Sequence, residues 1–293
     1  MTVRIVTDSN TMIPLALAAE LGITVVPLIV SIGGDELAED ADLDLPEAYR
    51  RLRAGEQATT SAPAPGVFAA TYDQLASQPI VSVHIGASYS GTFNAARVGA
   101  ESSDAEVRLV DTANASFLAG MCVLAAAEAA VDGGGIDEVV AAAESVAAAV
   151  ASVFTIAELD RAVAGGRLQI TGDESGAPVL LMRGADITAL GTVHSADEAA
   201  DAMFDHVAAI DGPLRLGVGD ADAGPVVDEL TARLRAARPD DDVIRYAVGP
   251  TVAAHAGMGT FGIVYHSVAR SARTSADRTA ASSLRSRSRE RPA

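Results

Sequence analysis

The sequence predicts an α/β protein of two domains, the first with a mainly parallel sheet and the second a mixed α+β domain. The chain has 293 residues, 49% of them hydrophobic, which is enough for two domains of ordinary size. Short β-rich segments alternate with helical segments as far as residue 152, whereas beyond it pairs of strands lie between helices. We therefore expect domains at residues 1–152 and 153–268.

In the first domain, each β-rich segment ends in a turn and is usually followed by a helical pattern. The segment from Asp35 to Asp44 is acidic and predicts a loop. Residues 59–66 cannot form a helix or a central strand, because Pro63 and Pro65 lack N–H donors. We expect strands at residues 3–7, 24–32, 80–85 and 107–110, and helices at 14–21, 46–53, 67–75, 92–101, 116–131 and 136–151.

The second domain begins with a short strand and a helix that Gly165 and Gly166 end. From Ala269 the composition changes to Arg, Ser, Thr and Ala, with seven of the 21 arginines, which predicts a disordered tail over residues 269–293. We expect strands at residues 153–156, 179–182, 187–193, 214–218, 243–248 and 260–267, and helices at 157–164, 196–208 and 225–236.

Composition excludes several classes of function. A net charge of −18 argues against a general nucleic-acid binder, and the absence of lysine excludes a Schiff-base or P-loop lysine. The longest apolar run, residues 115–131, is interrupted by Glu128 and predicts a packed helix, not an integral membrane segment. With one cysteine, Cys122, no clustered Cys/His ligands and no signal peptide before the first strand, we expect a cytoplasmic protein without a transition metal or cofactor.

The segment from Ile80 to Asn94 predicts a ligand site. A buried strand turns at Gly86 and enters a helix near Gly91, and hydroxyls of Ser88, Ser90 and Thr92 lie between them. The N-terminus of a helix has unpaired N–H groups that favour an anion. A single serine there would be a helix cap. Three hydroxyls within five residues favour an oxyanion site without a metal.

Two further strand ends carry polar groups, and ligands of open α/β sheets bind at the carboxyl ends of strands. Asp8 follows the first strand and Asp111 the fourth. For these two acids, capping of a turn and contact with a ligand are equally supported. For Thr60 and Ser61, in the proline-rich segment, and for Ser90, a ligand role is favoured.

Two alternatives use the same residues. A serine hydrolase would employ Ser88 or Ser90 with His255, although Ser90 stands where a G-x-S-x-G elbow has its last glycine. A sensor would bind a small non-lipid anion in the same cleft. The sequence from Gly257 to Gly262 matches G-x-G-x-x-G, but a β-rich run follows it, so a dinucleotide site is rejected.

The ordered set of motifs resembles the DegV family, which includes the fatty-acid-binding subunits of bacterial fatty acid kinase. The matching pieces are Thr7-Asp8-Ser9, Thr60-Ser61 with Pro63 and Pro65-Gly66, Ser90-Gly91-Thr92, Asp111-Thr112 with Ser116, Gly165-Gly166-Arg167, and His255-Ala256-Gly257-Met258-Gly259. Together they extend over nearly all of residues 1–267.

The resemblance implies a long-chain fatty acid buried between or beneath two α/β domains. Its carboxylate would be held by Thr60, Ser61 and Ser90, with Gly91 and Thr92 in the same motif, and His255 and Arg167 would match the family's late histidine and its G-G-R arginine. A separate fatty acid kinase catalytic subunit would then phosphorylate the bound acid, which implies a place in phospholipid metabolism. The chain would be a carrier and not the enzyme. It departs from many relatives at His194, Ala62 and Met258.

Overall fold

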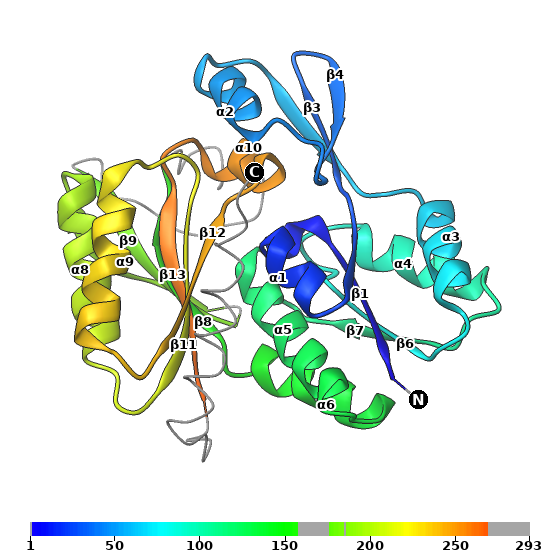
Figure 1. Ribbon diagram of the computed structural model, residues 1–293. Helices are drawn as coiled ribbons and strands as arrows, with labels where there is room; N and C mark the ends of the chain where they lie inside the picture. Colours follow the sequence, from blue (N-terminus) through cyan, green and yellow to red (C-terminus); the bar gives the residue numbers. More distant parts are fainter. Residues whose placement is uncertain (1, 158–175, 185, 269–293) are drawn as a thin grey trace, which may run out of the picture.

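The computed structural model describes residues 2–157, 176–184 and 186–268, and it has the mixed α/β fold that the sequence predicts (Figure 1). The expected helix at residues 157–164, Arg167 and the tail at residues 269–293 lie outside the described residues, apart from Ala157. The described part contains two large sheets and one small sheet.

The first large sheet consists of four parallel strands, because each of its strands is connected to the next through helices. Its order is β2 (Ile23–Val26), β1 (Arg4–Asp8), β6 (Ile80–His84) and β7 (Val107–Asp111). One face is covered by α3 (Pro65–Leu75) and α4 (Thr92–Glu101), which pack on Val6 and Ile80. The other face is covered by α5 (Phe117–Val131) and α6 (Ile136–Ala147), while α1 (Leu15–Glu20) follows β1. The carboxyl ends of the strands therefore share one edge.

A small antiparallel sheet is inserted between β2 and α3, in the order β4 (Asp35–Ala38), β3 (Ile29–Ile32) and β5 (Ala58–Ser61). The predicted single strand over residues 24–32 was wrong, because Pro27 interrupts it and the chain changes sheets there. The predicted acidic loop was wrong at its start, where β4 pairs with β3. A further helix, α2 (Leu45–Arg53), packs beside this small sheet.

The proline-rich segment after β5 was predicted correctly in part. Residues 59–61 belong to β5, which is an edge strand and not a central one, as predicted, but α3 begins at Pro65 and not at residue 67, so the end of this segment is helical. Proline suits the first turn of a helix, where its missing N–H would have no partner in any case.

The second large sheet has six strands and mixed directions, as predicted for the second domain. Its order is β10 (Asp186–Val193), β9 (Ala177–Arg183), β8 (Ala151–Thr155), β13 (Phe261–Ser267), β11 (Leu214–Asp220) and β12 (Asp242–Ala247), with only β11 and β12 parallel. Helices α8 (Ala196–Ala208) and α9 (Pro225–Ala237) cover one face. The predicted division between residues 152 and 153 falls inside β8, so we propose that the domains divide just before it, at the connection from α6 to β8.

The helix α10 (Pro250–Ala256) was missed by the sequence analysis. Gly249 precedes Pro250 at its first turn, which is the pattern that could have identified it. In Figure 1 α10 lies beside α2 and the small sheet, and within that sheet it contacts β5 and β3.

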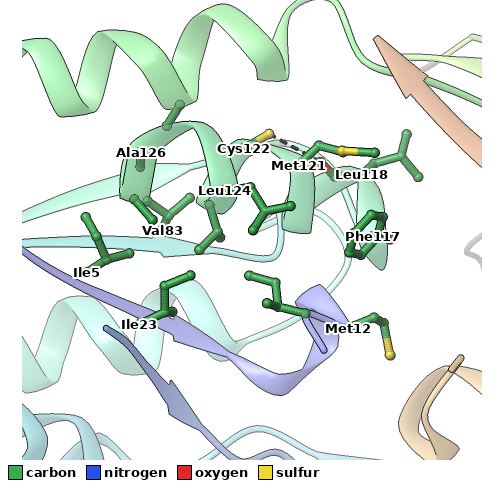
Figure 2. Close-up of a cluster of buried hydrophobic side chains, with 14 of the residues drawn as sticks. Ile5, Met12, Ile23, Val83, Phe117, Leu118, Met121, Cys122, Leu124 and Ala126 are labelled. Atoms are coloured by element: carbon green, nitrogen blue, oxygen red, sulfur yellow. Dashed lines mark hydrogen bonds between the residues drawn. The ribbon is translucent and has the colours of Figure 1, made fainter. Parts of the chain in front are cut away.

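The main core is continuous through both large sheets, with α5 between them. Phe117, Leu118, Met121 and Leu124 of α5 are buried, and they join Val83 of the first sheet to one cluster (Figure 2). The same cluster includes Met182, Tyr246 and Val264 of the second sheet. Cys122 is also buried there, and desolvation raises the pKa of its thiol to about 12.

Candidate ligand-binding site

Asp8, at the end of β1, is completely buried and forms a cap. Its Oδ2 accepts hydrogen bonds from Nδ1 of His84 at 2.9 Å and from the backbone N–H of Ile85 at 3.1 Å. Its Oδ1 accepts a hydrogen bond from the N–H of Asn10 at 3.1 Å. These bonds tie the carboxyl ends of β1 and β6 together. Of the two roles considered for Asp8, the observed geometry is that of the cap.

His84 extends this network into the interior of the first domain. Its Nε2 lies 2.7 Å from the Ser82 hydroxyl, and the Tyr72 hydroxyl lies 3.0 Å from the same group, so both contacts are hydrogen bonds. Burial raises the pKa of Tyr72 to about 12, which keeps its hydroxyl protonated. An Asp–His–Ser order is that of a hydrolase triad. In this protein all four side chains are 0% exposed, so no substrate can reach Ser82.

The turn between β6 and α4 presents the hydroxyls that the sequence singled out. Gly86 allows this turn to pack closely, because a Cβ on it would lie 2.8 Å from the backbone of Ala113. Ser88 and Gly91 are exposed and Ser90 is half-buried. The Oγ of Ser90 lies 2.8 Å from Oγ1 of Thr92 and accepts a hydrogen bond from the Thr92 N–H at 3.2 Å.

Thr60 and His255, far apart in the sequence, are in direct contact. Oγ1 of Thr60 on β5 lies 3.0 Å from Nε2 of His255 in the last turn of α10, and this is a hydrogen bond. Both residues are half-buried, whereas Ser61, next along β5, is exposed. The small sheet therefore brings a hydroxyl from the first half of the chain to an imidazole near its end.

Glu39 fixes the start of α10. Its Oε2 accepts hydrogen bonds from Oγ of Ser9 and Oγ1 of Thr251, both at 2.7 Å, and its Oε1 accepts one from the Thr251 N–H at 3.0 Å. A negative charge at a helix N-terminus is favourable. Desolvation nevertheless raises the pKa of this buried carboxyl. Glu39 therefore positions the helix that carries His255.

A cavity of about 190 Å³ lies between α5, α10 and the second sheet, and His255 lines it. Tyr89, which adjoins Ser90 in the sequence, also lines it. Its described lining contains no arginine, aspartate or glutamate, so an anion there would meet hydroxyls, amides and one imidazole. The apolar part includes Ile85, Leu118, Phe154, Ile156, Met182, Tyr246, Val248, Val252, Phe261 and Val264, and the polar part includes Asn10, Ser116, Ser152, Thr251, His255 and Thr260.

Ser116 was noted in the sequence only as part of a motif, and Asn10 was not proposed for the site. Ser116 has φ 55° and ψ −148°, an unusual conformation for a residue other than glycine, and strained backbone is often found at ligand sites. Its N–H donates to Oδ1 of Asn10 at 2.7 Å. Thr251 was missed because α10 was missed. Within the described ranges, no group of three or more His, Cys, Asp or Glu side chains is arranged to hold a metal.

Fold and site together define a mixed α/β protein with a parallel sheet, a separate mixed sheet and a mostly apolar cavity between them, an architecture suited to binding a small molecule. The chain belongs to the DegV family, since the family model described as "Uncharacterised protein, DegV family" matches residues 2–268. A DegV domain-containing protein of Streptomyces coelicolor is 36% identical over 277 residues, covering 90% of this chain and 98% of that protein. None of the described helices is both long and apolar enough to cross a membrane.

Solved structures share the fold over most of the chain. One, described as fatty acid binding of a DegV family protein from Thermus thermophilus, is 27% identical, with a TM-score of 0.82, and the match covers 92% of this chain and all of that chain. Another, DegV from Bacillus subtilis, described as a fatty acid binding protein, has a TM-score of 0.81 with the same coverage. At 23% identity it supports the fold alone.

Proposed function

We propose that the protein binds a long-chain fatty acid, with its carboxylate near Thr60 and His255 and its alkyl chain in the cavity. The observation that carries this proposal is the hydrogen bond between Thr60 and His255, because His255 also lines the mostly apolar cavity. Membership of the DegV family and the Thermus thermophilus structure support the choice of ligand. Each buried CH₂ would contribute about 0.8 kcal/mol.

The carboxylate would be met by local donors. Burial of a charged group is costly unless hydrogen bonds satisfy it, and bonds to a charged group are the stronger kind. Ser90 and Thr60 supply hydroxyls, and His255 supplies a ring N–H. Ser61, Gly91 and Arg167 complete the set that the family resemblance implies, with Thr92 holding the Ser90 hydroxyl.

We further propose that the protein works in the cytoplasm as a carrier that presents the acid to a separate kinase. In that step a carboxylate oxygen attacks the terminal phosphorus of ATP, the bond to ADP breaks, and an acyl-phosphate forms. The chemistry would belong to the kinase, and this chain would orient the carboxylate. No residue of this chain needs to act as a nucleophile.

The test compares two neighbouring threonines of β5. Thr60→Val removes the hydroxyl that contacts His255, and we expect it to weaken binding of a long-chain fatty acid by about 1–3 kcal/mol, the cost of losing a donor to a charged group. Thr59→Val, on the exposed side of the same strand, is the matched control and should not change binding. Extraction and mass spectrometry of the purified wild type should also yield a fatty acid. No affinity of the folded wild type for any fatty acid would refute the proposal.

A further inference from the structure

A groove larger than the cavity lies on the other side of the Tyr246 ring. A groove of about 900 Å³ lies between α1, the segment that follows β4, and the end of β12. Tyr246 is the one described residue that lines both the groove and the cavity. The groove is mainly apolar where it faces the first domain, with Met12, Ile13, Leu15 and Ile23 among its lining residues.

Tyr246 is held in place as a rigid wall. Its ring stacks on that of Phe117, with centroids 4.2 Å apart and an interplanar angle of 16°. It also lies over Gly219 of β11, where a Cβ would come within 2.1 Å of the ring. The residue is only 7% exposed. A side chain at position 219 would occupy the space that the ring fills.

We propose that Tyr246 is the partition between the cavity and the groove and that it limits the length of the acyl chain that the protein accepts. This inference rests on the proposed function. The cavity is smaller than typical pockets for drug-sized ligands, about 300–1,000 Å³, so its walls decide how much of an alkyl chain can be buried. Removal of the ring would join the two spaces. Each further methylene that entered the groove would then raise the affinity about fourfold.

The experiment measures the affinity of a homologous series of saturated fatty acids for the wild type, Tyr246→Leu and Tyr246→Phe. For the wild type we expect the affinity to rise with chain length up to a limit. In Tyr246→Leu the limit should move to longer chains, with about a fourfold gain for each added methylene. Tyr246→Phe keeps the ring and loses only the hydroxyl, so it should keep the wild-type limit. Circular dichroism and thermal unfolding establish that each variant is folded.

Different results separate the two proposals. If the wild type binds no member of the series, the proposed function fails. If the wild type binds but folded Tyr246→Leu keeps the same limit, or loses affinity equally for all lengths, the partition is refuted. If Tyr246→Leu does not fold, the same series of fatty acids is measured with Gly219→Ala. The methyl group added at position 219 displaces the Tyr246 ring, while the tyrosine side chain itself is kept. A changed limit in that variant supports the partition, and an unchanged limit overturns it.

Discussion

Replacement of Asp8 by alanine should destabilise the protein severely, because three buried donors would lose their acceptor. These are Nδ1 of His84 and the N–H groups of Ile85 and Asn10. Each buried donor without a partner costs about 1–3 kcal/mol, so the expected loss is about 3–9 kcal/mol. Proteins of ordinary stability unfold with only about 5–15 kcal/mol. In Asp8→Asn the amide oxygen can take the place of Oδ2 and keep the bonds from His84 and Ile85, while the bond from Asn10 is lost. The unfolding free energy should then fall by about 1–3 kcal/mol.

Urea unfolding followed by circular dichroism measures these losses. The matched control is Asp111→Ala at the end of β7, since Oδ1 of Asp111 accepts hydrogen bonds from the N–H groups of Ala87 and Ala113. Asp111 is exposed, so water can replace it, and we expect a loss below about 1 kcal/mol. If Asp8→Ala is no more destabilising than Asp111→Ala, the buried network around Asp8 does not stabilise the fold in this way.

Three other predictions concern single side chains. The raised pKa of Glu39 means that the folded protein keeps this proton to higher pH than the unfolded chain does, so its unfolding free energy should fall as pH rises from about 4.5 through that pKa. In Glu39→Gln this decrease of the unfolding free energy with pH should disappear, whereas in the control Glu36→Gln, at an exposed position, it should remain. Urea unfolding at several pH values measures both variants. Ser90→Ala should weaken fatty-acid binding by about 1–3 kcal/mol, whereas a titration of Ser88→Ala should match the wild type. Cys122, with its pKa raised to about 12, should resist alkylation until the protein unfolds, and rapid labelling of the native protein followed by mass spectrometry would contradict this.

Much of the fold could be predicted from local pattern. The strand at Ile80 is an uninterrupted buried run, and all five residues of β6 are indeed buried. The mixed second sheet followed from adjacent strand pairs. By contrast, β4 has an acidic sequence and two exposed residues, so no apolar alternation marked it. Its pairing with β3 supplies a stability that the local sequence does not reveal.

The site could be predicted only where its residues are close in the sequence. Ser90 and Thr92 are two residues apart, and their contact follows from the turn before α4. The Thr60–His255 contact joins residues that are 195 positions apart, so no local signal could indicate it; the family resemblance brought both into one set. The partition by Tyr246 depends on glycine in a neighbouring strand and on a ring from α5, which only the tertiary structure brings together.

The position of α5 between the two large sheets has a consequence for how a ligand enters. If the parts that contain the two large sheets moved apart as rigid bodies, the side chains of Phe117 and Met121, which are 0% exposed, would become accessible to water. Exposure of apolar surface to water is unfavourable, so such a movement is costly. α10 belongs to the same interior, because Ala253 is buried in the main cluster and Val252 packs against it. A ligand therefore has to reach the cavity without separation of the two halves.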